Sequence, residues 1–423
     1  MSEFDVAALG SLLLPLELIY EIAGYLPTNS LAALNRTCKC ARYILHPVLY
    51  TQPMDKVMQI LKWGGNKGRA QEQAMLNLLP LIIRANKDDA RIGHQALVLT
   101  CQGGALNMVC SLICNGIPVN PAGNQVLSED NSPLMQAIRF DHPRVVETLI
   151  DAEVDWEKVT LPTRSLAASK PDAGRGNMLH YAAIRGAYRV MDLLVSLGIK
   201  TRYCDQFGRS PLSLAAEVGC ADTVRVLIKY KADINSTDKD QRTPLMHAVL
   251  NGHVAAVKAL LDAGARLDLA GKQHRGPLSH AAARGYPEII RALLDGGANF
   301  HEVDGRGRTP LVWAACNGHS KCIRVLLEAG ASPDISDKDT ISPLHLAAIR
   351  DHFLAIQALI EGGANVGIVN HVGRSPLSVA IELRRSDIIG LLIDHGADLY
   401  QKSYFGRTPL SYASAEVGRE TPV

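Results

Sequence analysis

The chain has 423 residues, a formal net charge of +2 and 5% aromatic residues. This near-neutral balance and low aromatic content do not favour nucleic acid as a bulk partner. Nine cysteines without a secretory signal favour reduced thiols and a cytoplasmic or nuclear location. No apolar run approaches the roughly 18 residues of a membrane span, so we expect no membrane partner.

The first 50 residues predict a short tail and three small helices. We expect residues 1–10 to form a disordered tail. A helix begins near Leu14 with Pro15 in its first turn, and Gly24 and Pro27 end it. Two further short helices can form up to Tyr50. About forty residues in three helices make a very small core, which is marginal without a partner.

The segment 11–50 resembles an F-box. The marks that carry the resemblance are Leu14-Pro15-Leu16-Glu17, Ile22, Tyr25-Leu26, Leu31, Leu34, Cys38 and Leu49-Tyr50. The third helix lacks the tryptophan that the family usually carries. The resemblance implies docking onto the Skp-type adaptor of a cullin ubiquitin ligase, through an apolar face made of Leu14, Pro15, Leu18, Ile22, Leu26 and Leu31. The alternative interpretation is a helical cap on the domain that follows.

Residues 51–90 are less regular and predict a helical linker or an eroded repeat. The next unit, 94–120, contains Ala96-Leu97, Cys101, a glycine at 103 or 104, an apolar run at 109–113 and Gly116. It is followed by Ser132-Pro133-Leu134. Terminal repeats are often atypical because they cap a stack.

From residue 179 onward the chain repeats. Leucines stand at 179, 212, 245, 278, 311, 344, 377 and 410, at intervals of 33 residues. Six of the eight leucines follow Ser-Pro or Thr-Pro, Leu278 follows Gly-Pro, and Leu179 follows Asn-Met. The hydroxyl residue suits a helix N-cap and the proline suits the first helical position. Gly318 can end the first helix in a left-handed conformation, and a second apolar helix ends at Gly330.

These units resemble ankyrin repeats, with Ser-Pro-Leu-His-Leu-Ala-Ala at 342–348 and Leu-Leu-Asp-Ala-Gly-Ala at 260–265. The resemblance implies an all-α solenoid of antiparallel helix pairs with short hairpin fingers. We expect about ten repeats over 91–418, the first two irregular and the last truncated. The interval from Leu134 to Leu179 is longer than the others, which predicts an insertion at 153–177. This insertion is either a binding loop or a tolerated surface loop.

The ankyrin resemblance implies that a target protein contacts the concave face, at the two positions after each Ala-Ala. The insertion adds a tryptophan as a candidate contact. The candidate target-binding residues are Arg139, Phe140, Trp156, Ile184, Arg185, Glu217, Leu250, Asn251, Arg284, Asn317, Ile349 and Arg350. Arginines are frequent among them, which favours an acidic or phosphorylated target segment. A second arginine series, preceding the Ser/Thr-Pro-Leu anchors, is typical of structural or solvated side chains.

The sequence predicts no catalytic residues, metal site or cofactor. Cysteines lack a second Cys or His pair at metal-ligand spacing and are interpreted as small buried residues. His180 and His345, and likewise His253 and His319, occupy repeat positions that the ankyrin family uses for structural hydrogen bonds. We therefore expect a non-enzymatic, monomeric chain that binds a Skp-type adaptor, through it a cullin, and an unidentified target protein. The alternative is an interaction scaffold, or a transcriptional or signalling cofactor, without a ubiquitin role.

Overall fold

The computed structural model describes residues 90–120, 132–154, 173–271 and 274–417. The predicted F-box, residues 51–89 of the predicted linker and Trp156 lie outside these residues, so they remain predictions. The described residues form helices, turns and loops with no strand, as expected for an ankyrin-type solenoid. The chain divides into an N-terminal unit, Met1–Gln206, and a C-terminal unit, Phe207–Val423.

The described part of the N-terminal unit consists of three helix pairs. They are α6 (Ala90–Gly103) with α7 (Leu106–Cys114), α8 (Pro133–Arg139) with α9 (Pro143–Asp151), and α10 (Ala173–Arg185) with α11 (Tyr188–Ser196). The irregular unit predicted at 94–120 is therefore a helix pair whose first helix is longer than the others. Gly104 and Gly116, with φ of 70° and 84°, follow its two helices.

One boundary differs from the prediction. Residues 173–177 were expected to belong to the insertion, but α10 begins at Ala173. In other repeats proline follows the N-cap, lacks an N–H and clashes with a preceding turn, so the helix begins there. Met178 occupies that position here and allows the helix to extend toward the N-terminus. Residues 155–172 of the predicted insertion lie outside the described residues.

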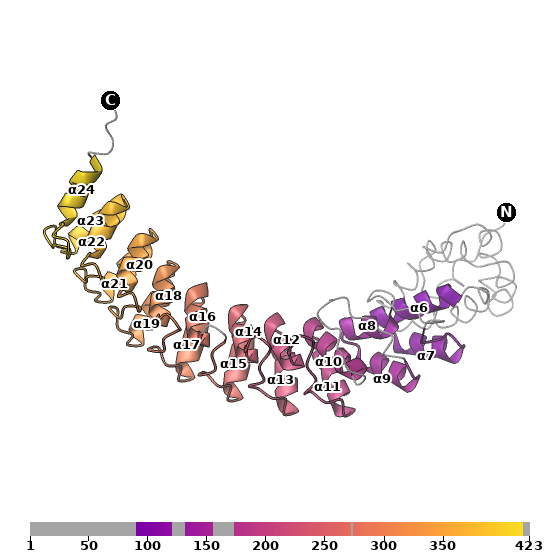
Figure 1. The fold of residues 1–423 in the computed structure, drawn as a ribbon. Coiled ribbons are helices and arrows are strands. Elements are labelled where there is room, and N and C mark those ends of the chain that lie inside the picture. The colour runs from indigo at the N-terminus through magenta and orange to yellow at the C-terminus, as the bar shows by residue number, and fades with distance from the viewer. Residues whose placement is uncertain (1–89, 121–131, 155–172, 272–273, 418–423) are drawn as a thin grey trace, which may run out of the picture. The chain divides into compact units, whose positions relative to one another are not determined.

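The C-terminal unit repeats the same pair. It contains α12 (Pro211–Val218), α13 (Ala221–Lys229), α14 (Pro244–Leu250), α15 (Val254–Asp262), α16 (Pro277–Arg284), α17 (Pro287–Asp295), α18 (Pro310–Cys316), α19 (Ser320–Glu328), α20 (Pro343–Ile349), α21 (Phe353–Glu361), α22 (Pro376–Glu382), α23 (Ser386–Asp394) and α24 (Pro409–Val417). Within this unit, the first helices α12 to α20 form one row on the concave side and the second helices form the outer row (Figure 1).

The predicted caps are confirmed. Thr243 Oγ1 accepts the backbone N–H of Met246 at 3.2 Å, and Thr309 Oγ1 accepts that of Val312 at 3.3 Å. Gly318 has the predicted left-handed conformation, with φ of 75°. Helices of seven to nine residues are marginal alone, so most of their stability comes from packing between repeats.

Histidines join successive repeats as the family resemblance implied. His253 Nε2 hydrogen-bonds to the carbonyl oxygen of Glu217 at 2.9 Å, and His319 Nε2 to that of Ala283 at 3.2 Å. His345 bridges Ser342 Oγ at 2.8 Å and the carbonyl oxygen of Arg374 at 2.9 Å. Each bond satisfies a polar group near a helix end and ties it to the neighbouring repeat.

Replacing Gly219 with alanine is expected to destabilise the C-terminal unit by about 2–3 kcal/mol. Gly219 has φ of 85°, and an added Cβ would lie 2.4 Å from the His253 ring. Gly264→Ala is a matched control, because its φ of 84° is similar but nothing lies within 4 Å of the added Cβ. Urea denaturation should therefore place Gly264→Ala nearer the wild type, and equal losses would contradict the proposed clash with His253.

Candidate protein-binding surface

The first helices of the C-terminal unit place side chains in recurring positions, counted from each helix N-cap. The residue before the N-cap is the pre-cap arginine in all but one repeat, where it is Ile341. The inner position lies four residues after the N-cap and the closing position seven residues after it. The inner positions are Leu214, His247, His280, Trp313, Leu346, Val379 and Tyr412, and the closing positions described at side-chain level are Glu217, Leu250, Ala283, Cys316, Ile349 and Glu382.

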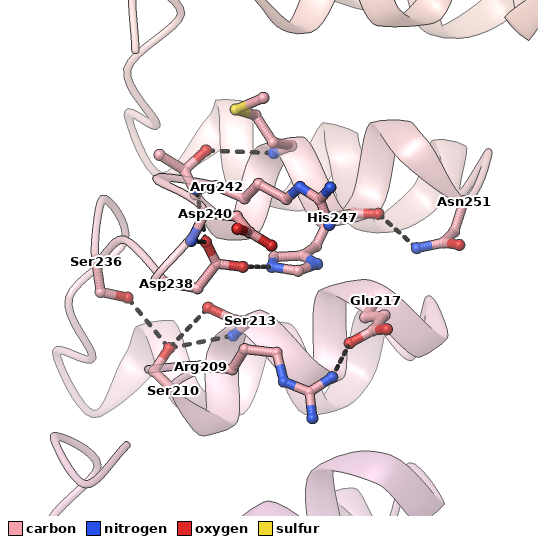
Figure 2. A network of polar contacts seen from close by, with 12 residues as sticks. Arg209, Ser210, Ser213, Glu217, Ser236, Asp238, Asp240, Arg242, His247 and Asn251 are labelled. Atoms are coloured by element: carbon pink, nitrogen blue, oxygen red, sulfur yellow. Dashed lines mark hydrogen bonds and ion pairs between the residues drawn. The ribbon is translucent and has the colours of Figure 1, made fainter. Parts of the chain in front are cut away.

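Two repeats neutralise their own pre-cap arginine. Arg209 Nη1 pairs with Glu217 Oε2 at 2.9 Å (Figure 2), and Arg374 Nη1 pairs with Glu382 Oε2 at 2.6 Å. In both repeats the carboxylate occupies the closing position. Arg308 has Cys316 there and pairs instead with Asp337 of the following finger, Nε to Oδ2 at 3.3 Å. A carboxylate is therefore the partner of this arginine in these three repeats.

A second acidic position organises the fingers, five residues before the N-cap. Asp238 Oδ1 accepts the backbone N–H groups of Asp240 and Arg242 at 2.8 Å each, and its Oδ2 bonds His247 Nε2 at 3.0 Å (Figure 2). Burial lowers the pKa of His247, although Glu217 and Asp238 oppose this effect. Asp238 therefore holds both a turn and an inner-position side chain.

Asp304 repeats this arrangement in a later finger. Its Oδ1 accepts the backbone N–H groups of Arg306 and Arg308 at 2.8 and 3.0 Å, and its Oδ2 accepts the indole N–H of Trp313 at 3.0 Å. The indole is therefore held in one orientation, with its ring available to neighbouring side chains.

Pre-cap arginines also stack on aromatic rings in the inner position. The guanidinium carbon of Arg275 lies 3.5 Å from the centroid of a Trp313 ring, and that of Arg308 lies 5.2 Å away. Arg374 and Arg407 lie 5.1 and 5.8 Å from the Tyr412 ring. Such cation–π contacts hold the guanidinium groups in defined orientations.

The residues predicted to bind a target differ in exposure. Ile184, Glu217, Leu250 and Ile349 are half-buried. The exposed ones are Arg139, Phe140, Arg185, Asn251, Arg284, Asn317 and Arg350. Asn317 Nδ2 donates to the carbonyl oxygens of Ala283 and Trp313 at 3.1 Å each, so its amide contributes to packing between repeats. Whether any of these residues contacts a target stays a prediction.

Sequence reasoning missed the inner position, where His247, His280 and Trp313 lie. A signal was present, because the same position holds Leu214, Leu346 and Val379 in other repeats. Three successive replacements of an aliphatic residue by a ring that can form polar contacts mark this part of the row. The cysteine interpretation was partly wrong: Cys101, Cys316 and Cys322 are buried, but Cys114 and Cys204 are exposed.

The structure shows neither a candidate metal centre nor a candidate membrane helix in the residues it describes. No group of three or more His, Cys, Asp or Glu side chains is arranged to hold an ion in these residues. Similarly, no helix within the described ranges has the length and apolarity needed to cross a bilayer. The surface above is thus the candidate functional site.

A model of the family "Ankyrin repeats (3 copies)" matches residues 179–271, 268–339 and 344–421, which together exceed half of the chain. The chain belongs to the ankyrin-repeat family. This confirms the ankyrin part of the sequence prediction. The F-box resemblance of 11–50 remains a prediction.

Similar proteins include cortactin-binding protein 2 of Oryctolagus cuniculus, 30% identical over 99 residues, and of Mus musculus, 31% identical over 99 residues. Each match covers 23% of this chain and 6% of the relative. The human ASB11 ankyrin repeat domain is 29% identical, with a TM-score of 0.48, over 52% of this chain and 98% of that one. The ankyrin repeat domain of Bcl-3 is 28% identical, with a TM-score of 0.47, over 49% of this chain and 95% of that one.

Proposed function

We propose that the chain is the substrate-recognition adaptor of a Skp/cullin/F-box ubiquitin ligase. Ankyrin repeats indicate a protein–protein interaction scaffold, a fold typical of non-enzymatic binding domains. The observation that supports the ligase role is the ordered set of marks in 11–50, from Leu14-Pro15 to Leu49-Tyr50. In this proposal a monomeric chain, in the cytoplasm or nucleus, docks a Skp-type adaptor through 11–50 and holds a target on the concave ankyrin face.

The mechanism is a gain in effective concentration. Tethering a target beside the ligase makes ubiquitin transfer effectively intramolecular, so the chain itself performs no bond chemistry. The arginine-rich row on the first helices would select the target, and the apolar side chains of the F-box-like segment would select the adaptor. A scaffold without a ubiquitin role is the second candidate, because the ankyrin repeats by themselves indicate protein–protein interaction and no more.

Changing Leu14 and Pro15 together to alanine is expected to abolish co-purification of the full chain with a Skp-type adaptor. Removing one apolar anchor and a helix-starting proline should disrupt a small docking face whose energy is concentrated in a few residues. Leu12→Ala, outside the family pattern, is the control and should retain capture. Circular dichroism should show the repeats intact in all variants. Failure of the wild-type chain to capture the adaptor would reject the ligase role and favour the scaffold.

A further inference from the structure

The repeats of α14 and α16 lack acidic partners that other repeats supply: the finger that follows Arg242 lacks its aspartate, and the closing positions of both helices lack a glutamate. The finger that follows Arg275 keeps its aspartate, Asp304, whose Oδ2 accepts the indole N–H of Trp313. Gly271 stands at the finger position that holds Asp238 and Asp304 in the neighbouring repeats. Ala283 stands at the closing position that holds Glu217 and Glu382 elsewhere, and Leu250 stands there in the preceding repeat. The pre-cap arginines Arg242 and Arg275 therefore have no closing-position glutamate like those that pair with Arg209 and Arg374.

Arg275 is held in place by an aromatic ring. Arg275 Nε is buried and has no hydrogen-bond partner in the part of the chain that the structure describes. Its guanidinium lies against Trp313, which fixes its plane without supplying an acceptor. Burial lowers the pKa of Arg275; Asp304 opposes this and Arg308 adds to it. A fixed guanidinium with unused donors is preorganised for an anion.

Positive charge converges on His280, the inner-position residue of α16. Burial, together with repulsion from Arg275, Arg284 and Arg242, lowers the pKa of His280 to about 4. The ring is therefore neutral at physiological pH and cannot add to or cancel the arginine charges. Arg242 and Arg284 are exposed, and Arg275 is half-buried. Figure 2 shows Arg242 beside His247, on the same side of the row as Arg209.

We propose that Arg242, Arg275 and Arg284 form a receptor for glutamate or aspartate side chains of an acidic peptide segment on a partner protein. This inference rests on the proposed protein-binding function and names the chemistry of the target. A carboxylate is favoured because Glu217 and Glu382 show which group satisfies a pre-cap arginine in this register. The partner protein supplies the carboxylates that are missing from the closing positions of α14 and α16.

The distance between adjacent first helices also predicts how the acidic residues of the partner peptide are spaced. Adjacent first helices pack at about 8–10 Å. A peptide in the extended polyproline II conformation rises about 3.1 Å per residue and makes one turn in about three residues, so its side chains at i and i+3 lie on the same side. Three residues of extended peptide therefore span one repeat. A segment with acidic residues at i and i+3 matches Arg242 and Arg275 simultaneously, and Arg284 lies at the exposed end of α16 to receive a neighbouring acid.

The most direct test adds a carboxylate to the chain itself, so that the proposed binding site is already occupied. Ala283→Glu places a carboxylate where Glu217 and Glu382 stand, so it should pair with Arg275 and exclude the peptide without removing any arginine. Ala283→Gln has nearly the same size and no charge and is the matched control. The probe is a fluorescent extended peptide with glutamates at i and i+3, measured by anisotropy with the full chain. Matched peptides carry glutamine or phosphoserine at those positions.

The glutamate peptide is expected to bind the wild type at least about 10-fold more tightly than the glutamine peptide, with affinity falling as salt rises. Ala283→Glu and Arg275→Glu should each lose at least about 10-fold, whereas Ala283→Gln should bind like the wild type. Arg291→Glu, on the outer helix α17, controls for net charge and should also leave binding unchanged. Circular dichroism checks the fold of each variant.

The proposal is overturned if glutamate and glutamine peptides bind equally, or if Ala283→Glu binds the glutamate peptide as the wild type does. Tight binding of the phosphoserine peptide with weak binding of the glutamate peptide would overturn the carboxylate assignment. Adaptor capture by the 11–50 segment is measured on the same Ala283→Glu protein. Retained capture with lost peptide binding separates failure of this site from failure of the ligase role.

Discussion

Replacing Leu344 with alanine is expected to lower the free energy of unfolding of the C-terminal unit by about 2–5 kcal/mol. Leu344 is the anchor leucine of α20 and has no exposed surface. Short helices in a stack depend on contacts with their neighbours, so a cavity here weakens α20 and its contacts with α18 and α22 together. This is a large fraction of a typical domain's stability.

The repeat provides its own control. Leu410 occupies the same anchor position, but 57% of its surface is exposed. Leu410→Ala should therefore lower the free energy of unfolding by less than about 1 kcal/mol, because folding buries little of the apolar surface of Leu410. Trp313 is the sole tryptophan of 207–423, so replacing Trp63 and Trp156 with phenylalanine makes fluorescence report on this unit. Equal urea midpoints for the two alanine variants would contradict the inference that burial between repeats carries the stability.

The regular part of the fold could be predicted because one local signal recurs. A Ser or Thr cap, a proline and a leucine every 33 residues determine where each first helix begins, and the structure confirms these starts from Pro211 to Pro409. The signal failed at α10, where Met178 replaces proline and the helix starts earlier. The start of each first helix is set by the proline that stops the helix from extending further. Loss of that proline therefore moves the helix start but leaves the buried residues of the repeat in place.

The candidate site was harder to predict because its members come from different repeats. Arg275 stacks on Trp313, which lies 38 positions later, and Arg308 pairs with Asp337, which lies 29 positions later. No local pattern joins such positions; they meet because one finger and the next first helix are neighbours in the stack. The structure also revealed that two repeats neutralise their arginines internally, and this made the absence of Glu or Asp at Gly271 and Ala283 informative.

Acidification from pH 7 to pH 5 is expected to destabilise the C-terminal unit, with His280 alone contributing about 1–2 kcal/mol. Burial lowers its pKa from the ordinary value of 6.5 to about 4, with Arg275, Arg284 and Arg242 acting in the same direction. Between these two values the unfolded chain binds a proton that the folded chain rejects. The contribution of neutral His280 is therefore fully present above pH 6.5 and is lost as pH falls toward 4. Burial also lowers the pKa values of His247 and His345, which adds to the loss in the same direction.

His280→Leu isolates this contribution, because leucine occupies the inner position at Leu214 and Leu346. The variant should lose less stability than the wild type between pH 7 and pH 5 in urea denaturation followed by Trp313 fluorescence. A remaining pH dependence is expected from His247 and His345. Identical pH profiles for wild type and His280→Leu would mean that the ring accepts its proton without penalty from burial or from the three arginines, and would contradict this prediction.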